Sequence, residues 1–317
     1  MQTDRDYFIC CKTFFSATVL QKCCKSYFAK SGKSKKPHKH WVFRLLQAKG
    51  NYSSSTTTEE SSDPSVDDSK DVSIETQELY NQNGIVITAT ELNIDGTWGP
   101  EVKVLIENNS DKNVTVQTRN SSVNGFMTDI GLSCDVAAGK KANDSLILDR
   151  TTIELCSTET ITNIEFSFHI FDSETWDDIV NTDMISITTS ANGNYDQSYD
   201  DSGDVLYDNN GIRIISKGFV EDGIFGPELY LYIENNSGQN ITVQARDTSI
   251  NGFMIEPNMS DDVVSGKVNL GGMTFFESDF ELNGITDVET VETAFHIFNT
   301  ESWEDIDSTS PITINCN

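Results

Sequence analysis

The feature that most constrains this chain is an internal repeat that aligns without gaps. The segment LYNQNGIVI at residue 79 returns as LYDNNGIRI at residue 206, an offset of 127 residues. Aligned over 79–190 and 206–317, the two copies are identical at 45 of 112 positions. A unit of this length can fold around its own core, whereas a solenoid repeat depends on its neighbours. The sequence therefore predicts two copies of one domain, arranged as independent beads and separated by a Gly-, Asp- and Asn-rich linker at 191–205.

Each repeat is built from short segments in which the apolar residues recur at every second position. Val102, Val104 and Ile106 share one face of EVKVLIEN, and NIEFSFHIFD at 163–172 has the same spacing. This period is typical of a half-buried antiparallel strand. Asn and Gly in ENNS, VNGF and DGTWGPE indicate turns between the segments. Each repeat contains about seven such strands and no sustained helical period. The sequence therefore predicts an all-β protein with two tandem immunoglobulin-like antiparallel β-sandwiches. We call these repeat 1 (79–190) and repeat 2 (206–317).

The charge of the chain is unevenly distributed. The net charge is −28, but residues 1–50 hold 11 Lys and Arg against two Asp, and residues 51–317 hold 11 against 48 Asp and Glu. Such an acidic body is repelled by nucleic acid and by anionic membrane surfaces. Nucleic acid is therefore not an expected partner, and a membrane is expected only through an N-terminal anchor.

The N-terminal part of the sequence differs in character from the repeats. An export signal needs a basic start followed by an unbroken apolar run. Here Asp4 and Asp6 lie in the start, and Lys12 interrupts the apolar run. We therefore expect residues 1–50 to be a basic leader that is either disordered or an altered signal or anchor region. Residues 51–78 are acidic and rich in Ser and Thr, which predicts a flexible tether. Tethers of this kind commonly follow a lipid-anchored cysteine on bacterial surfaces. The expected location is therefore extracellular, anchored at a Gram-positive cell surface.

Four aromatic residues are the candidate binding residues. Trp176 and Trp303 follow the matching segments FHIFDSETWDDI and FHIFNTESWEDI, while Trp98 and Phe225 lie in the turns DGTWGPE and DGIFGPE. For Trp176 and Trp303 the favoured interpretation is a plug that closes the end of each sandwich. The alternative is an exposed aromatic platform for a sugar or a peptide.

The polar residues around these tryptophans predict scaffold rather than chemistry. His169 and His296 are expected on the strand face opposite the core phenylalanines, and neither has a second histidine at metal-ligand spacing. Ser173 or Thr300 is a candidate cap for a short helical turn. The neighbouring carboxylates are expected to be solvated. Because no nucleophile–base pattern is evident, the prediction is a protein that is not an enzyme.

Cysteines and carboxylates leave two possibilities open. A Cys134–Cys156 bridge is possible, but Asp261 and Asn283 occupy these positions in repeat 2, so the fold cannot depend on it. No D-x-D-x-D-G loop occurs, so no cofactor is expected, yet clustered carboxylates keep calcium possible. The linker carboxylates are one candidate group: Asp196, Asp200, Asp201 and Asp204.

The repeats resemble an uncharacterised domain family of surface proteins and lipoproteins of Clostridia and related Firmicutes. The resemblance rests on IENNSDKNVTVQTRNSSVNGFM, a following Gly-Lys pair at 139–140 or 266–267, and IEFSFHIFD…TWDDI…ISIT. It implies an immunoglobulin-like fold and an N-terminal anchor, and it implies no catalytic residue.

The combined prediction is a non-catalytic bacterial surface or secreted protein. It would be a monomer that displays a binding or adhesion module for an unknown glycan, peptide or protein. One alternative is a structural spacer within an envelope assembly. A calcium-dependent binding protein or an enzyme is the less favoured alternative.

Overall fold

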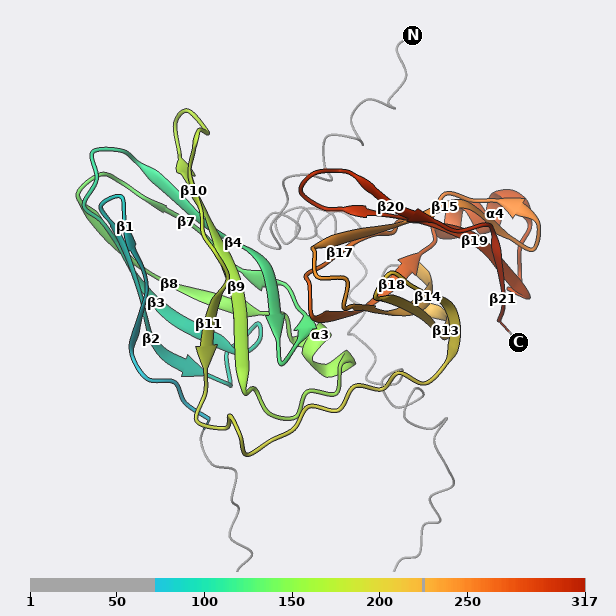
Figure 1. Ribbon diagram of the computed structural model, residues 1–317, viewed down its shortest axis with the longest axis horizontal. Coiled ribbons are helices and arrows are strands. Elements are labelled where there is room, and N and C mark those ends of the chain that lie inside the picture. Colours follow the sequence, from blue (N-terminus) through green and yellow to red (C-terminus); the bar gives the residue numbers. More distant parts are fainter. Residues whose placement is uncertain (1–71, 224–225, 317) are drawn as a thin grey trace, which may run out of the picture. The chain divides into compact units, whose positions relative to one another are not determined.

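The computed structural model describes residues 72–223 and 226–316. The leader at 1–50, residues 51–71 of the tether predicted at 51–78, and Phe225 lie outside the described residues. Strands dominate the described part, and their pairings are antiparallel with one exception, which confirms the all-β prediction (Figure 1). Among the described residues, no helix is both long and apolar enough to cross a membrane.

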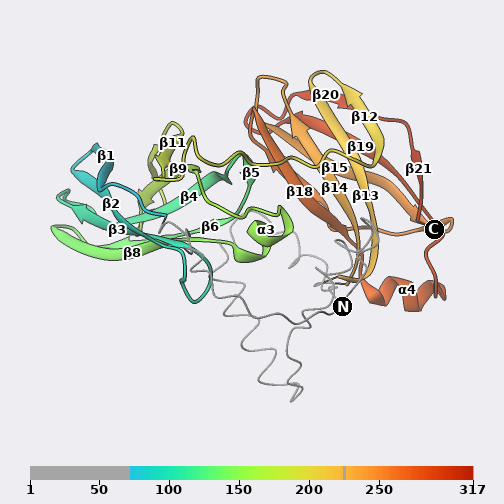
Figure 2. The ribbon, with the colours of Figure 1, turned by 90° about the horizontal axis from the view of Figure 1, so that it is seen from below.

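Repeat 1 folds into two antiparallel sheets (Figure 2). The first has the order β1-β2-β3-β8-β6; in the second, β9 lies between β10 and β4, β11 also pairs with β9, and β5 and β7 pair with β4. The bounds are β1 Gln77–Gln82, β2 Ile85–Asn93, β3 Glu101–Asn108, β4 Val114–Val123, β5 Phe126–Met127, β6 Ile130–Gly131, β7 Ser133–Val136, β8 Lys140–Leu148, β9 Asn163–Asp172, β10 Asp178–Asn181 and β11 Ile185–Thr188.

Repeat 2 has two sheets of the same kind. One has the order β12-β13-β14-β18, and the other β16-β15-β19-β20, with β17 on β15 and β21 on β19. The bounds are β12 Asp204–Asn209, β13 Ile212–Gly223, β14 Gly226–Asn235, β15 Ile241–Ile250, β16 Phe253–Met254, β17 Ser260–Val263, β18 Lys267–Thr274, β19 Thr290–Asn299, β20 Asp305–Ser308 and β21 Ile312–Asn315.

The period-two pattern places the apolar residues in the core of each sandwich. Val102 and Ile106 on β3 and Phe166 and Phe168 on β9 are fully buried, as the alternation predicts. Truncating one of these phenylalanines to alanine would cost about 3–5 kcal/mol, because the rigid sheets cannot close the resulting cavity. The core therefore fixes which residues of β9 face outward, and the candidate site begins there.

Each repeat also contains one short helix that the sequence pattern does not predict. These are α3, Arg150–Leu155, and α4, Glu277–Asn283. The Asp149 carboxylate caps α3 by accepting from the Thr152 amide at 2.8 Å, and Gly284 ends α4 in the left-handed region at φ 67°. Helices of six and seven residues are too short to show a helical period.

The ends of repeat 1 and the linker are tied into the fold. The Ser190 amide donates to the Ser73 carbonyl at 2.8 Å, and β1 begins at Gln77, two residues before the repeat as aligned. In the linker, the Tyr199 hydroxyl donates to the Asn124 carbonyl at 2.6 Å, and its ring lies 4.9 Å from that of Phe126. The middle of the linker is therefore held against repeat 1.

A small buried cluster joins the two repeats. Phe126 and Cys156 of repeat 1 share it with Ile215, Tyr232 and Val268 of repeat 2. As a result β14, which the sequence predicts to be half buried, is buried on both faces. The repeats are therefore joined by packed contacts rather than arranged as independent beads.

Candidate functional site: two tryptophan hairpins

Each repeat carries a tight hairpin that ends in an exposed tryptophan. We call residues 172–178, between β9 and β10, the first tryptophan hairpin, and residues 299–305, between β19 and β20, the second. In the first, the Asp172 amide donates to the Asp177 carbonyl and the Trp176 amide donates to the Asp172 carbonyl, both at 2.9 Å. This closure puts Trp176 in the left-handed region at φ 65°, a position that favours Gly or Asn.

The second tryptophan hairpin repeats this geometry. The Asn299 amide donates to the Glu304 carbonyl and the Trp303 amide to the Asn299 carbonyl, again at 2.9 Å. Trp303 has φ 62°. Two tryptophans therefore hold the same strained backbone conformation at equivalent places in the chain.

The first residue of each hairpin holds the turn through one side-chain oxygen. Asp172 Oδ1 accepts from the amides of Glu174 at 2.9 Å and Thr175 at 3.2 Å. Asn299 Oδ1 makes the matching bonds to Glu301 and Ser302, at 2.9 and 2.8 Å. An amide oxygen and a carboxylate oxygen are equivalent as acceptors here, which explains why Asp and Asn interchange between the repeats.

These bonds also correct the predicted cap. The turn is not helical, and the side chains of Ser173 and Thr300 do not cap it. Their hydroxyls instead lie 2.9 and 3.0 Å from the hydroxyls of Thr115 and Thr242 on the adjacent strand. The amide bonds to Asp172 Oδ1, that from Glu174 above all, hold the pKa of this carboxyl below its usual value.

A stack of rings supports each tryptophan from below. The rings of Phe171 and Trp176 lie 5.5 Å apart and 17° from parallel, and those of Phe298 and Trp303 lie 5.4 Å apart at 15°. Trp176 is nevertheless 68% exposed and Trp303 70% exposed. The predicted plug is therefore wrong: each indole rests with one side on a phenylalanine and presents the rest of its surface to solvent.

The histidine at the base of each stack is held by a carboxylate of the hairpin. His169 Nε2 lies 2.6 Å from Asp178 Oδ1, and His296 Nε2 lies 2.8 Å from Asp305 Oδ1. The bond to His169 lowers the pKa of Asp178. His169 Nδ1 is buried without a hydrogen-bond partner, so no hydroxyl or thiol nucleophile lies in reach of it among the described residues. The pair fixes the orientation of the imidazole under the hairpin.

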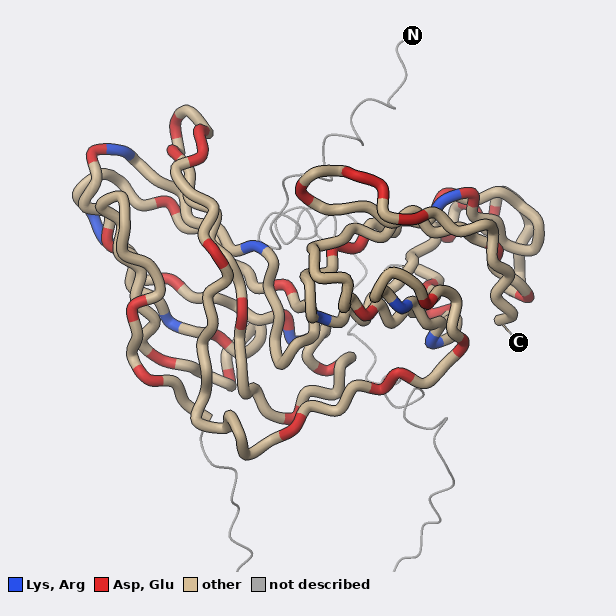
Figure 3. Tube along the Cα trace, in the orientation of Figure 1, with Lys and Arg blue, Asp and Glu red and all other residues tan. Residues whose placement is uncertain are grey.

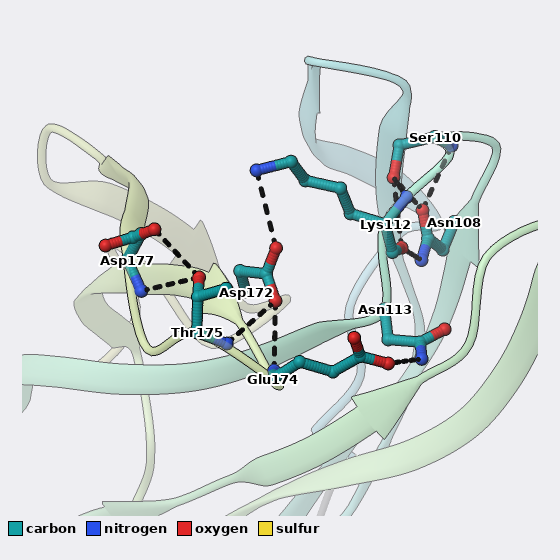
Figure 4. Close-up of polar contacts among 8 residues, drawn as sticks. All are labelled: Asn108, Ser110, Lys112, Asn113, Asp172, Glu174, Thr175 and Asp177. Atoms are coloured by element: carbon teal, nitrogen blue, oxygen red, sulfur yellow. Dashed lines mark hydrogen bonds and ion pairs between the residues drawn. The ribbon is translucent and has the colours of Figure 1, made fainter.

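A second turn braces the first tryptophan hairpin from the side (Figure 4). The buried Asn108 donates from Nδ2 to the carbonyls of Lys112 and Val136, at 2.7 and 2.9 Å, and accepts from the amide and hydroxyl of Ser110. This fixes the turn that ends at Asn113, whose side-chain Nδ2 donates to Glu174 Oε1 at 2.9 Å. The motif ENNS is thus structural, and it anchors the acidic turn next to Trp176.

The same brace recurs in repeat 2 with less charge. Asn235 makes the corresponding bonds to Gln239, Val263 and Ser237, and Asn240 donates to Glu301 at 2.9 Å. In repeat 1, Lys112 Nζ lies 3.4 Å from Asp172 Oδ2. In repeat 2 an amide contact between Asn299 and Gln239, at 2.9 Å, takes the place of that ion pair.

Asp and Glu residues occur in both hairpins and along the strands and turns of both repeats, and Lys and Arg are few among the described residues (Figure 3). No group of three or more His, Cys, Asp or Glu in the described part of the chain is placed to hold a metal ion. In the linker, Asp201 Oδ2 lies 2.8 Å from Arg213, and Asp200 Oδ2 lies 3.5 Å from Lys217. These two carboxylates are paired with cations of repeat 2.

The other two predicted binding residues are Trp98 and Phe225. Trp98 is 58% exposed in the turn between β2 and β3. In this turn Gly99 has φ 150°, and a Cβ there would lie 2.0 Å from the Leu148 carbonyl oxygen, so only glycine fits. Phe225, its counterpart in repeat 2, is outside the described residues.

The cysteines of the described residues are free thiols. Cys134 and Cys156 are both buried and unbridged, so the possible disulfide is not formed. Burial raises the pKa of each to about 12. Neither thiol has the accessible, depressed-pKa environment of a reactive cysteine.

Sequence reasoning missed the residues that support the tryptophans. Phe171 and Phe298 carry the indoles, and Asp178 and Asp305, which are exposed as expected, also bind the histidines. A signal was present, because His, Phe, Trp and Asp recur at the same four positions in both repeats. Only the hairpin closure shows that these four side chains meet.

Comparisons with known proteins do not show a family for this chain. No family model matches the chain, and no curated protein matches it. The crystal structure of the YadV chaperone is similar over 73% of this chain and 100% of that one, with 12% identity and a TM-score of 0.23. A protein of unknown function from Porphyromonas gingivalis W83 is similar over 68% of this chain and 90% of that one, with 10% identity and a TM-score of 0.19.

Proposed function

We propose that this protein is a non-catalytic binding module and that Trp176 and Trp303 are its ligand-contacting residues. The observation that carries this is a tryptophan in the left-handed region at the exposed end of a hairpin, found twice in the chain. For a residue with a Cβ this conformation costs roughly 1–2 kcal/mol. Strain of this kind, held in place by the surrounding turn, marks positions that serve a function.

The proposed ligand presents a flat, uncharged or cationic group. An indole supported by Phe171 is a rigid surface on which a sugar ring, or a cationic or aromatic side chain, can stack. The nearby carboxylates of Asp177 and Glu174 are acceptors for sugar hydroxyls or basic groups. A chain of net charge −28 repels anionic polymers, so a neutral glycan or a basic peptide fits best.

The setting that we propose is the bacterial surface. Its support is the acidic Ser/Thr-rich tether of the sequence and the resemblance to anchored surface proteins of Firmicutes. At the bacterial surface, the two domains would present two tryptophan hairpins on one tether. Two binding sites on one chain raise the avidity for a ligand without any further contacts.

A structural spacer is the second candidate. It is favoured by the buried cluster of Phe126, Tyr232 and Val268, which packs the repeats together. A spacer needs this packed joint and does not need exposed tryptophans. The two functions therefore predict different consequences for the same substitutions.

The test is a screen of the full chain against an array of neutral glycans and basic peptides. The wild type is compared with the double variant Trp176→Gly/Trp303→Gly, in which glycine suits the backbone of both hairpins. Leu282→Ala is the matched control, because Leu282 is 83% exposed on α4, away from the hairpins. The binding module is supported if the double variant loses a ligand that both the wild type and the Leu282→Ala control still bind. A wild type that retains no ligand contradicts it and favours the spacer.

A further inference from the structure

A short hairpin of repeat 1 forms the joint between the repeats. At its end, β5 lies beside the edge strand β18 of repeat 2 (Figure 2), and the Val268 amide donates to the Gly125 carbonyl at 3.0 Å. This is the one parallel pairing in the described part of the chain. The hairpin thus adds itself to the open edge of a sheet, a common mode of β-strand recognition.

Apolar side chains and one ion pair hold the hairpin in place. Phe126 is 3% exposed and lies in the cluster with Tyr232 and Val268, while Met127 packs against the core of repeat 2. Beside them, Lys267 forms an ion pair with Glu165 of repeat 1. The contact therefore combines an edge-strand hydrogen bond, an aromatic anchor and a charge pair.

The same hairpin exists in repeat 2 with its apolar side chains uncovered. Ser249 pairs with Met254 as Ser122 pairs with Met127, and the two hairpin glycines share φ 84°. Phe253 is nevertheless 47% exposed and Met254 68% exposed. The exposed carboxylate of Glu292 occupies the position that Glu165 holds in repeat 1. We call Asn251–Met254 with Glu292 the free docking hairpin.

The edge of repeat 1 that corresponds to β18 is not suited to receive such a hairpin. Lys141 and Asn143 stand on β8 where β18 has Val268 and Leu270. Lys141 is paired with Glu107, and this polar pair of positions offers no apolar side chains on which an aromatic anchor such as Phe126 could pack. The docking is therefore directional, since a hairpin of this type is received by a repeat-2-type edge and not by a repeat-1-type edge.

We propose that the free docking hairpin binds the open edge strand of a further β-sandwich domain. That edge carries a lysine followed by an aliphatic residue, as in Lys267–Val268, with an outward aromatic residue such as Tyr232 on the neighbouring strand. Phe253 is the anchor, and Glu292 pairs with the lysine. The protein is thus built to join a head-to-tail row of domains, an interface separate from the tryptophan hairpins.

The test uses the chain itself to supply the partner edge. An acceptor chain carries Phe126→Asp, which releases the edge of its β18, and Phe253→Asp, which removes its own docking hairpin. The wild-type chain, whose own β18 edge is occupied, is the donor. Sedimentation velocity of the mixture is expected to show a 1:1 complex.

Matched variants assign the contact. Donor Phe253→Asp is expected to weaken the complex at least tenfold, whereas donor Leu282→Asp, which changes a more exposed apolar residue on α4, leaves it intact. Adding Val268→Lys to the acceptor is expected to abolish binding. Complex formation that is indifferent to Phe253 and Val268 overturns the proposal.

Amide exchange at Val268 checks the acceptor, and thermal unfolding checks that both chains fold. Fast exchange without a complex overturns the proposal, because the edge is then open and unrecognised. Slow exchange overturns it as well, since Phe126 would then not be what holds the docked hairpin. Fast exchange with a complex that requires Phe253 supports it.

Discussion

Phe171 lies beneath Trp176 with ring centroids 5.5 Å apart, and the indole above it is still 68% exposed. The stack rigidifies a side chain that contributes little to the core. Repeat 2 builds the same pair from Phe298 and Trp303. These indoles are therefore expected to be dispensable for folding.

Replacing Trp176 with Gly is expected to change the free energy of unfolding by no more than about 1 kcal/mol. Relief of left-handed strain returns roughly 1–2 kcal/mol, and loss of the ring stack removes about 0.5–1.5 kcal/mol. Urea unfolding of the full chain measures the difference, with Trp303→Gly as an independent repeat of the experiment. A loss above about 3 kcal/mol would show that the indole is a structural residue after all.

Replacing Asn108 with Ala is expected to destabilise repeat 1 by about 2–4 kcal/mol, because buried carbonyls lose their donors. The affected groups are those of Lys112 and Val136. Asn109→Ala is the control, since Asn109 is exposed and its side chain makes none of these bonds. Thermal unfolding that is equally sensitive to both variants would contradict a bracing role for Asn108.

Replacing Asp172 with Asn is expected to flatten the acid dependence of stability. The pKa of this carboxyl is lowered in the folded state, so its contribution is present above the usual pKa and is lost as pH falls through the folded value. Asn keeps the acceptor oxygen without the titration, as Asn299 does. The measurement is the urea midpoint between pH 7 and pH 3, and Asn299→Asp should introduce the same acid dependence into repeat 2. Parallel profiles for all three proteins would refute this explanation.

Replacing Asp261 with Asn is expected to stabilise the protein above pH 7. Burial, followed by repulsion from Asp262, raises the pKa of Asp261 to about 7, and its Oδ2 is buried without a partner. The contribution of Asp261 to stability is then greatest below the pKa of about 4 that this carboxyl has in the unfolded chain, and it is lost as pH rises through about 7. The gain at pH 8 is on the order of 1–4 kcal/mol and should vanish at pH 4. Melting temperatures at the two pH values measure it, and an equal shift at both would rule out titration of Asp261.

Much of the architecture was accessible from the pattern of the sequence. The strand β3 alternates strictly, so its buried face follows from a period of two, whereas β9 begins with that period and is buried on both faces from Phe166 to Asp172. The strand β8 was missed, because its polar start, Lys140 and Lys141, hides its period, and the short helices were missed because they complete fewer than two full turns. For the site, the residue types were identified, but the assignment of Trp176 to a buried plug was wrong.

By itself the sequence determined the class of fold, the duplication and the candidate tryptophans. Each of these can be seen in the order and spacing of the residues along the chain. The tertiary structure alone decided which surfaces are covered. Exposure depends on what packs against a residue from elsewhere in the chain: Tyr232 is buried because repeat 1 docks on it, and Phe126 and Phe253 share one motif but differ in burial. For the same reason Trp176 is an exposed platform: its hairpin folds back so that Phe171 supports the indole from one side only.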